Sequence, residues 1–181
     1  MALVLVLAVG TVRAGSLADL DRDNGLPDAK LGTPLKAFQG LQKTEDVGRW
    51  LTCKRPSDVL RYGKYEVAGI TYNFFKDRLY SISVDLSEKG SVKGVLKLLE
   101  NQYGKDHSLD RRTYAQSNAV LEIREWAGTK AYCVYKNATD FDGGVLTFVD
   151  KPTWDLLQIP KKQQQAENRD KLKGSFLNGD F

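Results

Sequence analysis

The most regular pattern of hydrophobic and polar positions lies between residues 65 and 104. In its middle, the apolar residues Tyr80, Ile82, Val84 and Leu86 alternate with Ser81, Ser83 and Asp85. This period of two predicts an antiparallel strand with one buried face. A preceding apolar run, with Val67, Ile70, Tyr72 and Phe74, and the polar connection 76–78 complete a predicted β-hairpin.

A helical pattern follows this hairpin. Its apolar positions are Val92, Val95, Leu96, Leu99 and Tyr103, with Ser91 as the expected N-cap and Gly104 as the expected C-cap. An apolar helix stripe beside an apolar sheet face predicts that the helix packs on the sheet. We therefore expect an α+β fold, in which an antiparallel sheet of short strands and hairpins carries helices on one face, in two layers.

Weaker patterns predict the remaining elements. They are a helix from Thr33 and Pro34, a strand over 48–54, a polar connection over 55–64, a charged loop over 106–112, strands over 113–117 and 120–126, a hairpin that pairs 131–135 with 145–150, and a short helix from Pro152 to Pro160. Helices set between two groups of strands are typical of an α+β domain.

The chain divides into four predicted parts. Residues 1–14 combine a short apolar run with small residues before Ala14, which is typical of a secretory signal peptide cleaved after Ala14. They lack a basic leader, and a buried strand is the alternative interpretation. We expect a loose leader over 15–32, a single α+β domain over 33–159 and a polar tail over 160–181. The protein is therefore expected to be exported, either periplasmic or secreted.

Composition and charge place modest limits on the domain count and on the classes of partner. The 181 residues are 41% hydrophobic, which is enough for one core. The net charge of +4 comes from 27 basic residues scattered among 23 acidic ones, so we expect no nucleic-acid partner. No apolar run reaches the roughly 18 residues that a transmembrane helix needs.

Cys53 and Cys133 are the two cysteines, and each falls in a predicted strand. In an exported chain, an even cysteine count suggests a disulfide, so this pair is a disulfide candidate. The alternative is that both are small buried hydrophobic residues.

Few residues suggest a reaction. His107 is the single histidine, lies in a charged stretch and is expected to be solvated. No nucleophile elbow or phosphate-binding glycine loop is present. Glu122 and Glu125 have odd spacing along a strand, which places them on opposite faces. Asp19, Asp21 and Asp23 alternate along the chain and resemble the start of a calcium loop, but the glycine and the twelfth position do not fit. We expect no catalytic residue, cofactor or metal.

Aromatic residues are the remaining candidates for a binding surface. Trp126 and Tyr135 have polar neighbours along their strands and are our predicted surface anchors for a ligand or a protein. The alternative is that they belong to the core.

Four segments carry a family resemblance: LGTPLKAFQGLQ at 31–42, YEVAGITYNFFKDRLYSISV at 65–84, LLENQYGK at 98–105 and the run from Trp126 to Trp154. They resemble a group of small exported bacterial proteins of uncharacterised function. The resemblance implies a shared fold and transfers no catalytic residue. The element order is also similar to periplasmic modules of the β-lactamase-inhibitor-protein and outer-membrane assembly lipoprotein types, which bind other proteins.

These observations favour a non-enzymatic binding or interaction domain, whose partner is a protein or a small ligand of the cell envelope. One alternative is an enzyme that uses carboxylates from different strands. Another is a carrier of a small ligand or lipid, with a cavity between helices and sheet.

Overall fold

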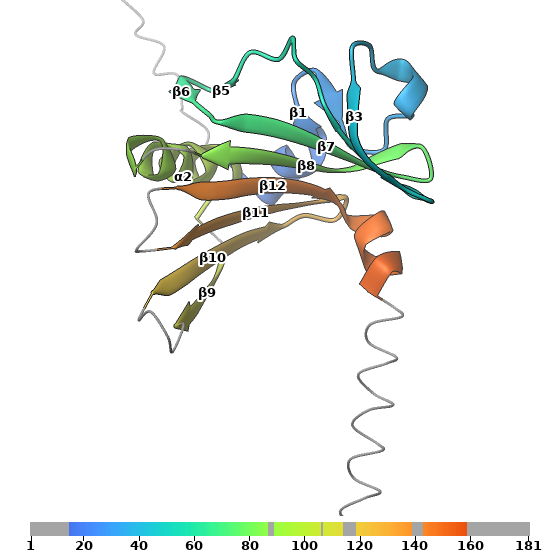
Figure 1. The fold of residues 1–181 in the computed structure, drawn as a ribbon. Coiled ribbons are helices and arrows are strands. Elements are labelled where there is room, and N and C mark those ends of the chain that lie inside the picture. The colour runs from blue at the N-terminus through green and yellow to red at the C-terminus, as the bar shows by residue number, and fades with distance from the viewer. Residues whose placement is uncertain (1–14, 87–88, 106, 114–118, 139–142, 159–181) are drawn as a thin grey trace, which may run out of the picture.

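Eight antiparallel strands form the main sheet, in the order β3-β4-β7-β8-β12-β11-β10-β9 (Figure 1). The computed structural model describes residues 15–86, 89–105, 107–113, 119–138 and 143–158. The strands are β3 (Gln42–Val47), β4 (Trp50–Lys54), β7 (Gly69–Phe75), β8 (Arg78–Leu86), β9 (Ser108–Thr113), β10 (Val120–Ala127), β11 (Ala131–Ala138) and β12 (Gly144–Asp150). The predicted α+β class, based on an antiparallel sheet, is confirmed.

Smaller elements surround this sheet. They are α1 (Leu17–Asp23), the hairpin of β1 (Gly25–Leu26) and β2 (Ala29–Lys30), the 3₁₀ turn η1 (Leu35–Ala37), the hairpin of β5 (Arg61–Tyr62) and β6 (Tyr65–Glu66), α2 (Lys89–Tyr103) and a helical segment at 151–158. The helix predicted from Thr33 and Pro34 is thus only the single turn η1, and the predicted connection 55–64 contains β5.

The predicted hairpin and helix are confirmed with small shifts. β7 and β8 join at Lys76 and Asp77, whose φ angles of 49° and 60° match a tight hairpin turn. α2 starts at Lys89, before the expected cap at Ser91. Gly104 ends it with a φ of 88°, and its N–H donates to the Glu100 carbonyl at 3.0 Å.

A row of directly paired residues crosses six neighbouring strands and defines the buried side of the sheet. The row consists of Cys53, Tyr72, Ile82, Phe148, Cys133 and Trp126. Every member is at most 1% exposed. Because paired residues point to the same side of a sheet, we call this side the helix face and the other the opposite face.

The same row corrects the disulfide prediction. Cys53 and Cys133 share a face, but β7, β8 and β12 lie between their strands. Strand spacing places their Cα atoms about 19 Å apart across the sheet, whereas a disulfide needs less than about 7 Å. Both cysteines are free and buried, and burial raises the pKa of each thiol. The disulfide prediction is wrong, and the alternative of two buried thiols is confirmed.

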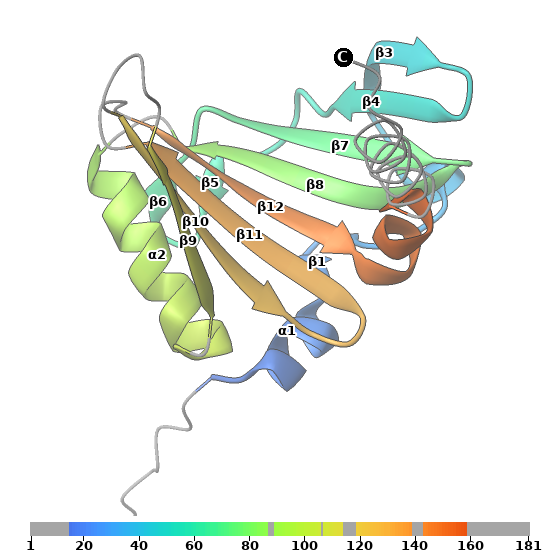
Figure 2. The same ribbon diagram turned by 90° about the horizontal axis from the view of Figure 1, so that it is seen from below.

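α2 packs on the helix face. The Tyr135 hydroxyl donates to the Val92 carbonyl at 3.1 Å, and Trp126 Nε1 donates to the Gly104 carbonyl at 2.8 Å. Segment 151–158 lies away from α2 in Figure 2, and its Lys151 Nζ is 5.3 Å from the ring centre of Tyr132. Tyr132 belongs to the opposite face, so the helices do not all share one face. The cause is local, since Asp150 caps this helix directly after β12.

Residues 15–32 are not a loose leader, and that prediction is wrong. Both the N–H and the hydroxyl of Ser16 donate to Asp19 Oδ2 at 2.8 Å, which fixes the start of α1. Leu20, Ala29 and Leu31 are at most 5% exposed and join the core. The few apolar residues of this polar segment are therefore sufficient to attach it to the sheet.

Both edge strands were missed from the sequence. Every residue of β3 and β9 is exposed, so neither strand has the alternation of apolar and polar residues that marks a half-buried strand. Their charged side chains protect the sheet edges from pairing with another chain. The charged loop predicted over 106–112 is for the most part β9.

Several predictions lie outside the described residues. They are the signal peptide over 1–14, most of the strand over 113–117 and the tail over 160–181. Within the described ranges, no helix has the length and apolar character needed to cross a membrane.

Candidate functional site

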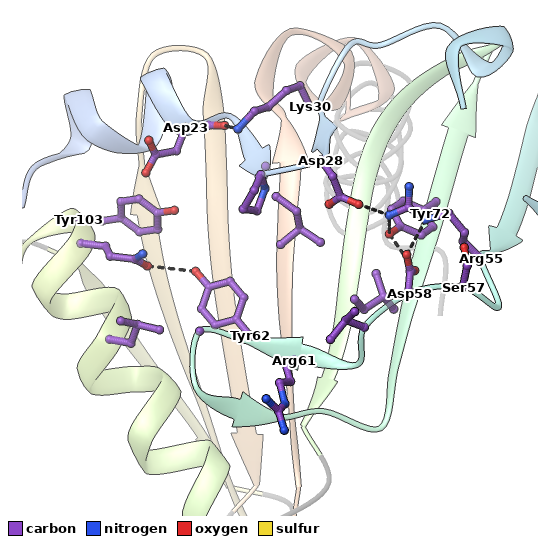
Figure 3. A pocket seen from close by; sticks show the side chains of 18 residues that line it. Asp23, Asp28, Lys30, Arg55, Ser57, Asp58, Arg61, Tyr62, Tyr72 and Tyr103 are labelled. Atoms are coloured by element: carbon purple, nitrogen blue, oxygen red, sulfur yellow. Dashed lines mark hydrogen bonds and ion pairs between the residues drawn. The ribbon is translucent and has the colours of Figure 1, made fainter. Parts of the chain in front are cut away.

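A cavity of about 790 Å³ lies between α2, the helix face and two hairpins (Figure 3). We call it the helix-side pocket. Its floor includes Leu26, Tyr62, Ile70 and Tyr103, each less than 9% exposed, and Leu98 of α2 adds an apolar wall. The volume and the apolar floor are those of a site for a small organic molecule.

Two glycines bring the β5–β6 hairpin close enough to α2 to form this wall. Gly63 has a φ of 59°, and a Cβ there would lie 2.7 Å from Leu98 Cδ2. On α2, a Cβ at Gly94 would lie 2.2 Å from Tyr65 Cε1. The Tyr62 hydroxyl then donates to Gln102 Oε1 at 3.2 Å, which links the hairpin to the helix. Larger residues at either glycine would force the two elements apart.

A charged network forms the other end of the pocket, on the right of Figure 3. Arg55 Nε donates to Asp58 Oδ1 at 2.5 Å, and its Nη2 donates to Asp28 Oδ2 and to the Tyr72 hydroxyl. The Tyr72 hydroxyl donates to Asp58 Oδ2 at 2.9 Å. The network joins the β1–β2 turn, the loop after β4 and strand β7, so it fixes the pocket entrance.

Pairing and burial shift the pKa values of Arg55 and of three tyrosines that line the pocket. Burial alone would lower the Arg55 pKa, but the carboxylates of Asp58 and Asp28 outweigh it and raise that pKa. Burial raises the pKa of Tyr62, Tyr72 and Tyr103, and Asp58 adds to the effect at Tyr72. Near neutral pH the arginine is a cation and the phenols are neutral, so the three tyrosines provide hydrogen-bonding groups and no general base.

A second hollow, of about 500 Å³, lies on the opposite face and is lined by Tyr80, Tyr132 and Trp154 among others. Beside it, the Trp50 ring lies 4.6 Å from Phe75 and 5.4 Å from Tyr80, centre to centre. Trp50 is 39% exposed and Trp154 is 40% exposed. These aromatic residues, rather than the predicted pair, reach the surface.

The prediction that Trp126 and Tyr135 are surface anchors is wrong. Trp126 is 0% exposed and Tyr135 is 1% exposed. The Trp126 indole N–H donates to the Gly104 carbonyl directly after α2, and the Tyr135 hydroxyl donates to the Val92 carbonyl within α2. Their polar strand neighbours Glu125 and Lys136 face the other side. Tyr135 lies two positions after Cys133 on β11, so their side chains share a face, and this spacing was the signal that could have placed Tyr135 in the core.

His107 is not solvated, which corrects another prediction. Its side chain is 10% exposed, and its ring centre lies 4.8 Å from that of Trp126. Nε2 lies 3.3 Å from Glu100 Oε1 and 3.4 Å from Arg124 Nη1. The chain passes over Trp126 between α2 and β9, so the histidine is covered by the helix and the sheet.

The carboxylates do not form a catalytic pair. Glu122 bonds to Arg111 at 2.8 Å on the helix face, whereas Glu125 lines the opposite-face hollow, so the predicted separation is confirmed. Asp21 accepts bonds from Thr129 and from the N–H groups of residues 129–131, and so holds the β10–β11 turn. In the part of the chain that the structure describes, no three His, Cys, Asp or Glu residues are grouped to hold a metal ion.

Comparison with known proteins found no match among family models, curated proteins or solved structures. The site geometry and the sequence are therefore the basis for a function.

Proposed function

We propose that this protein is an exported, non-enzymatic binding protein whose helix-side pocket holds a small ligand. The observation that carries the proposal is a cavity of about 790 Å³ with a buried apolar floor and charged groups that are already bonded to one another. Apolar lining with a few placed polar groups is the usual composition of a ligand site. Such a pocket binds a molecule without supplying a reactive group.

The paired state of the charges favours binding over catalysis. A carboxylate enzyme needs an acid and a base that converge on one substrate bond. In the helix-side pocket, Asp58 is 5% exposed and is bonded to both Arg55 and Tyr72. That carboxylate is therefore occupied in holding the pocket entrance.

Export is part of the proposal and is supported by the apolar run at the N-terminus. Cleavage after Ala14 would leave the packed segment that starts at Gly15 intact, because the bonds of Ser16 to Asp19 lie beyond the cut. The likeness to small exported bacterial proteins agrees with this location. We also propose that α1 and α2 form a second layer on the sheet and frame the pocket. Mass spectrometry of the protein from its native host tests for a chain that begins near Gly15.

Fluorescence of the neutral apolar probe N-phenylnaphthylamine tests binding in the pocket. Val59 lines the pocket and is 75% exposed on its rim, so Val59→Trp narrows the entrance without disturbing the core. We expect the wild type to enhance the probe's emission and Val59→Trp to lose most of this effect. The matched control is Leu156→Trp, a 64% exposed position in segment 151–158. Equal emission with all three proteins, or none with the wild type, would refute the pocket as a ligand site.

A second candidate is a protein partner on the opposite face. It is favoured by the exposed Trp50 and its contacts with Phe75 and Tyr80, because tryptophan and tyrosine often anchor protein interfaces. A photo-crosslinking residue at position 50 should then trap one defined envelope protein, whereas the same residue at position 156 should not. Identical products at both positions would remove this candidate.

A further inference from the structure

We infer, on the basis of the proposed function, that the helix-side pocket selects a ligand with a positively charged head group and an apolar body. The pocket has two different ends, as Figure 3 shows. Asp28, Arg55, Asp58 and Tyr72 gather at one end, and Tyr103, the last residue of α2, lies at the other. The charge of the first end determines the head group.

The Arg55 end carries a net charge of about −1, because one guanidinium faces two carboxylates, Asp28 and Asp58. The other cations of the lining do not cancel it. Lys30 Nζ donates to the main-chain carbonyl of Asp23 at 2.6 Å, which holds this ammonium group at the α1 side of the pocket, away from Arg55 in Figure 3. The Arg61 guanidinium is paired with Glu66 at 3.6 Å and is 60% exposed.

An anionic ligand meets an excess of negative charge at this end, because two carboxylates stand against one guanidinium. The Arg55 side chain is 16% exposed, and its Nε and Nη2 donors already bond to Asp58, Asp28 and Tyr72. A carboxylate or sulfate would have to displace Asp28 or approach two aspartates, which costs free energy by repulsion. Asp28 is 61% exposed at the entrance, and its Oδ2 accepts a bond from Arg55. Its other oxygen, Oδ1, has no bond to the residues that the structure describes. An ammonium group can bond to this carboxylate without breaking the network.

The tyrosines and the apolar floor complete the ligand class. The faces of Tyr62, Tyr72 and Tyr103 attract cations, as the Arg55 guanidinium carbon, 5.4 Å from the Tyr72 ring centre, already illustrates. Leu26, Ile70 and Leu98 line the space next to them, and Val59 stands exposed on the rim. An alkyl or aryl chain that covers these residues would add hydrophobic stabilisation. The class is therefore an ammonium amphiphile.

Isothermal titration calorimetry of the full chain with three single-tail probes tests the inference. Octylammonium, octyl glucoside and octyl sulfate share a tail and differ in head charge, and each is used below its micelle concentration. We expect octylammonium to bind about tenfold or more tightly than octyl sulfate, with octyl glucoside between them. Added salt should reduce the difference between the two charged probes. Val59→Trp should weaken all three, because each tail enters past this part of the rim.

Asp28→Asn removes the exposed negative charge and should bring the affinities for octylammonium and octyl sulfate within about threefold of each other. The matched control is Asp46→Asn, since Asp46 is 53% exposed and is paired with Lys43 on the edge strand β3, outside the pocket. The control should keep the wild-type preference. Circular dichroism of each variant verifies that the fold is retained.

Each outcome has a distinct meaning. Octyl sulfate binding as tightly as octylammonium, or equal effects of Asp28→Asn and Asp46→Asn, would overturn the charge preference. Octyl glucoside binding tightest would also overturn it, while the proposed ligand pocket would stand. Absence of binding by all three probes and by N-phenylnaphthylamine would refute both the inference and the proposed function.

Discussion

Tyr132 and Cys133 are neighbours on β11, yet they belong to two very different surfaces. Cys133 lies in the buried row of the helix face. Tyr132 lies in a row that also includes Thr52, Asn73, Ser81, Val149 and Ala127. On that opposite face, side chains bond to one another at the surface, as Thr52 Oγ1 does to Asn73 Oδ1 at 3.1 Å. The comparison teaches that cover by the segments packed on the helix face, rather than residue type, decides which aromatic residues are core. These segments include α2 over Trp126 and Tyr135, and the stretch around Phe38 over Tyr72 and Phe74.

The largest contrast is expected between two tryptophans. Trp126→Ala removes a fully buried side chain from the helix face and should lower the free energy of unfolding by about 3–5 kcal/mol. Trp154→Ala, at a 40% exposed position beside the opposite face, should change it by less than about 0.5 kcal/mol. Urea unfolding measures both. Similar losses in the two variants would show that the faces do not differ as described.

Two ion pairs provide the next contrast. Asp58→Asn breaks a pair whose carboxylate is 5% exposed and should lower the free energy of unfolding by about 3 kcal/mol. Asp155→Asn breaks the Lys151–Asp155 pair, whose carboxylate is 52% exposed, and should change it by less than about 0.5 kcal/mol. Thermal unfolding ranks the two. An Asp58→Asn protein as stable as Asp155→Asn would mean that the network at the pocket entrance contributes no stability.

Asp21 joins α1 to the turn between β10 and β11. Its contribution to the free energy of unfolding should depend on pH. Burial raises its pKa, but the hydrogen bonds from Thr129, Lys130 and Ala131 outweigh this and hold the pKa below 3.8. A lowered pKa stabilises the folded state above the unfolded pKa, and the contribution is lost as the pH falls through the folded value.

Asp21→Asn keeps one acceptor and should cost about 1–2 kcal/mol at neutral pH. The gap between wild type and variant should narrow below pH 3.8. Urea unfolding along a series of acidic pH values measures this gap, with Asp155→Asn as the control. A gap that stays constant with pH would refute the assignment of the effect to the ionised carboxylate.

The smallest contrast is between two tyrosine hydroxyls. Tyr135→Phe deletes a buried hydrogen bond to the Val92 carbonyl and should cost about 1 kcal/mol. Tyr132→Phe, on the opposite face, should be close to neutral. Chemical unfolding of both variants resolves the difference, and a larger loss at Tyr132 would reverse the assignment of the faces.

Local patterns were enough to predict the centre of the fold. The alternation from Ile82 to Leu86 and the stripe from Val92 to Tyr103 predicted β8 and α2. Tyr80 was expected on the same face as Ile82, but the irregular register between β7 and β8 places it beside the opposite-face hollow. The edges β3 and β9 are exposed on both sides, so no pattern marks them. Hydrophobic periodicity reports burial, and it says nothing of a strand that is not buried.

The candidate site was less predictable, since distant segments build it. The spacing of Arg55 and Asp58 shows that they can pair locally, but their contacts with Asp28 and Tyr72 depend on the register of the sheet and the position of the β1–β2 turn. The same dependence on register explains the wrong disulfide. Cys53 and Cys133 lie on strands that are four places apart in the sheet, and no local segment of the sequence encodes the order of the strands.

The most direct test of the central claim is an NMR titration of the isotope-labelled full chain with octylammonium. The account predicts that amide signals of Asp28, Val59 and Gln102, which surround the helix-side pocket, shift together. The indole N–H signals of Trp50 and Trp154 should stay in place. Shifts confined to those two indoles, or no saturable shift at the pocket residues, would contradict the assignment of ligand binding to the helix face.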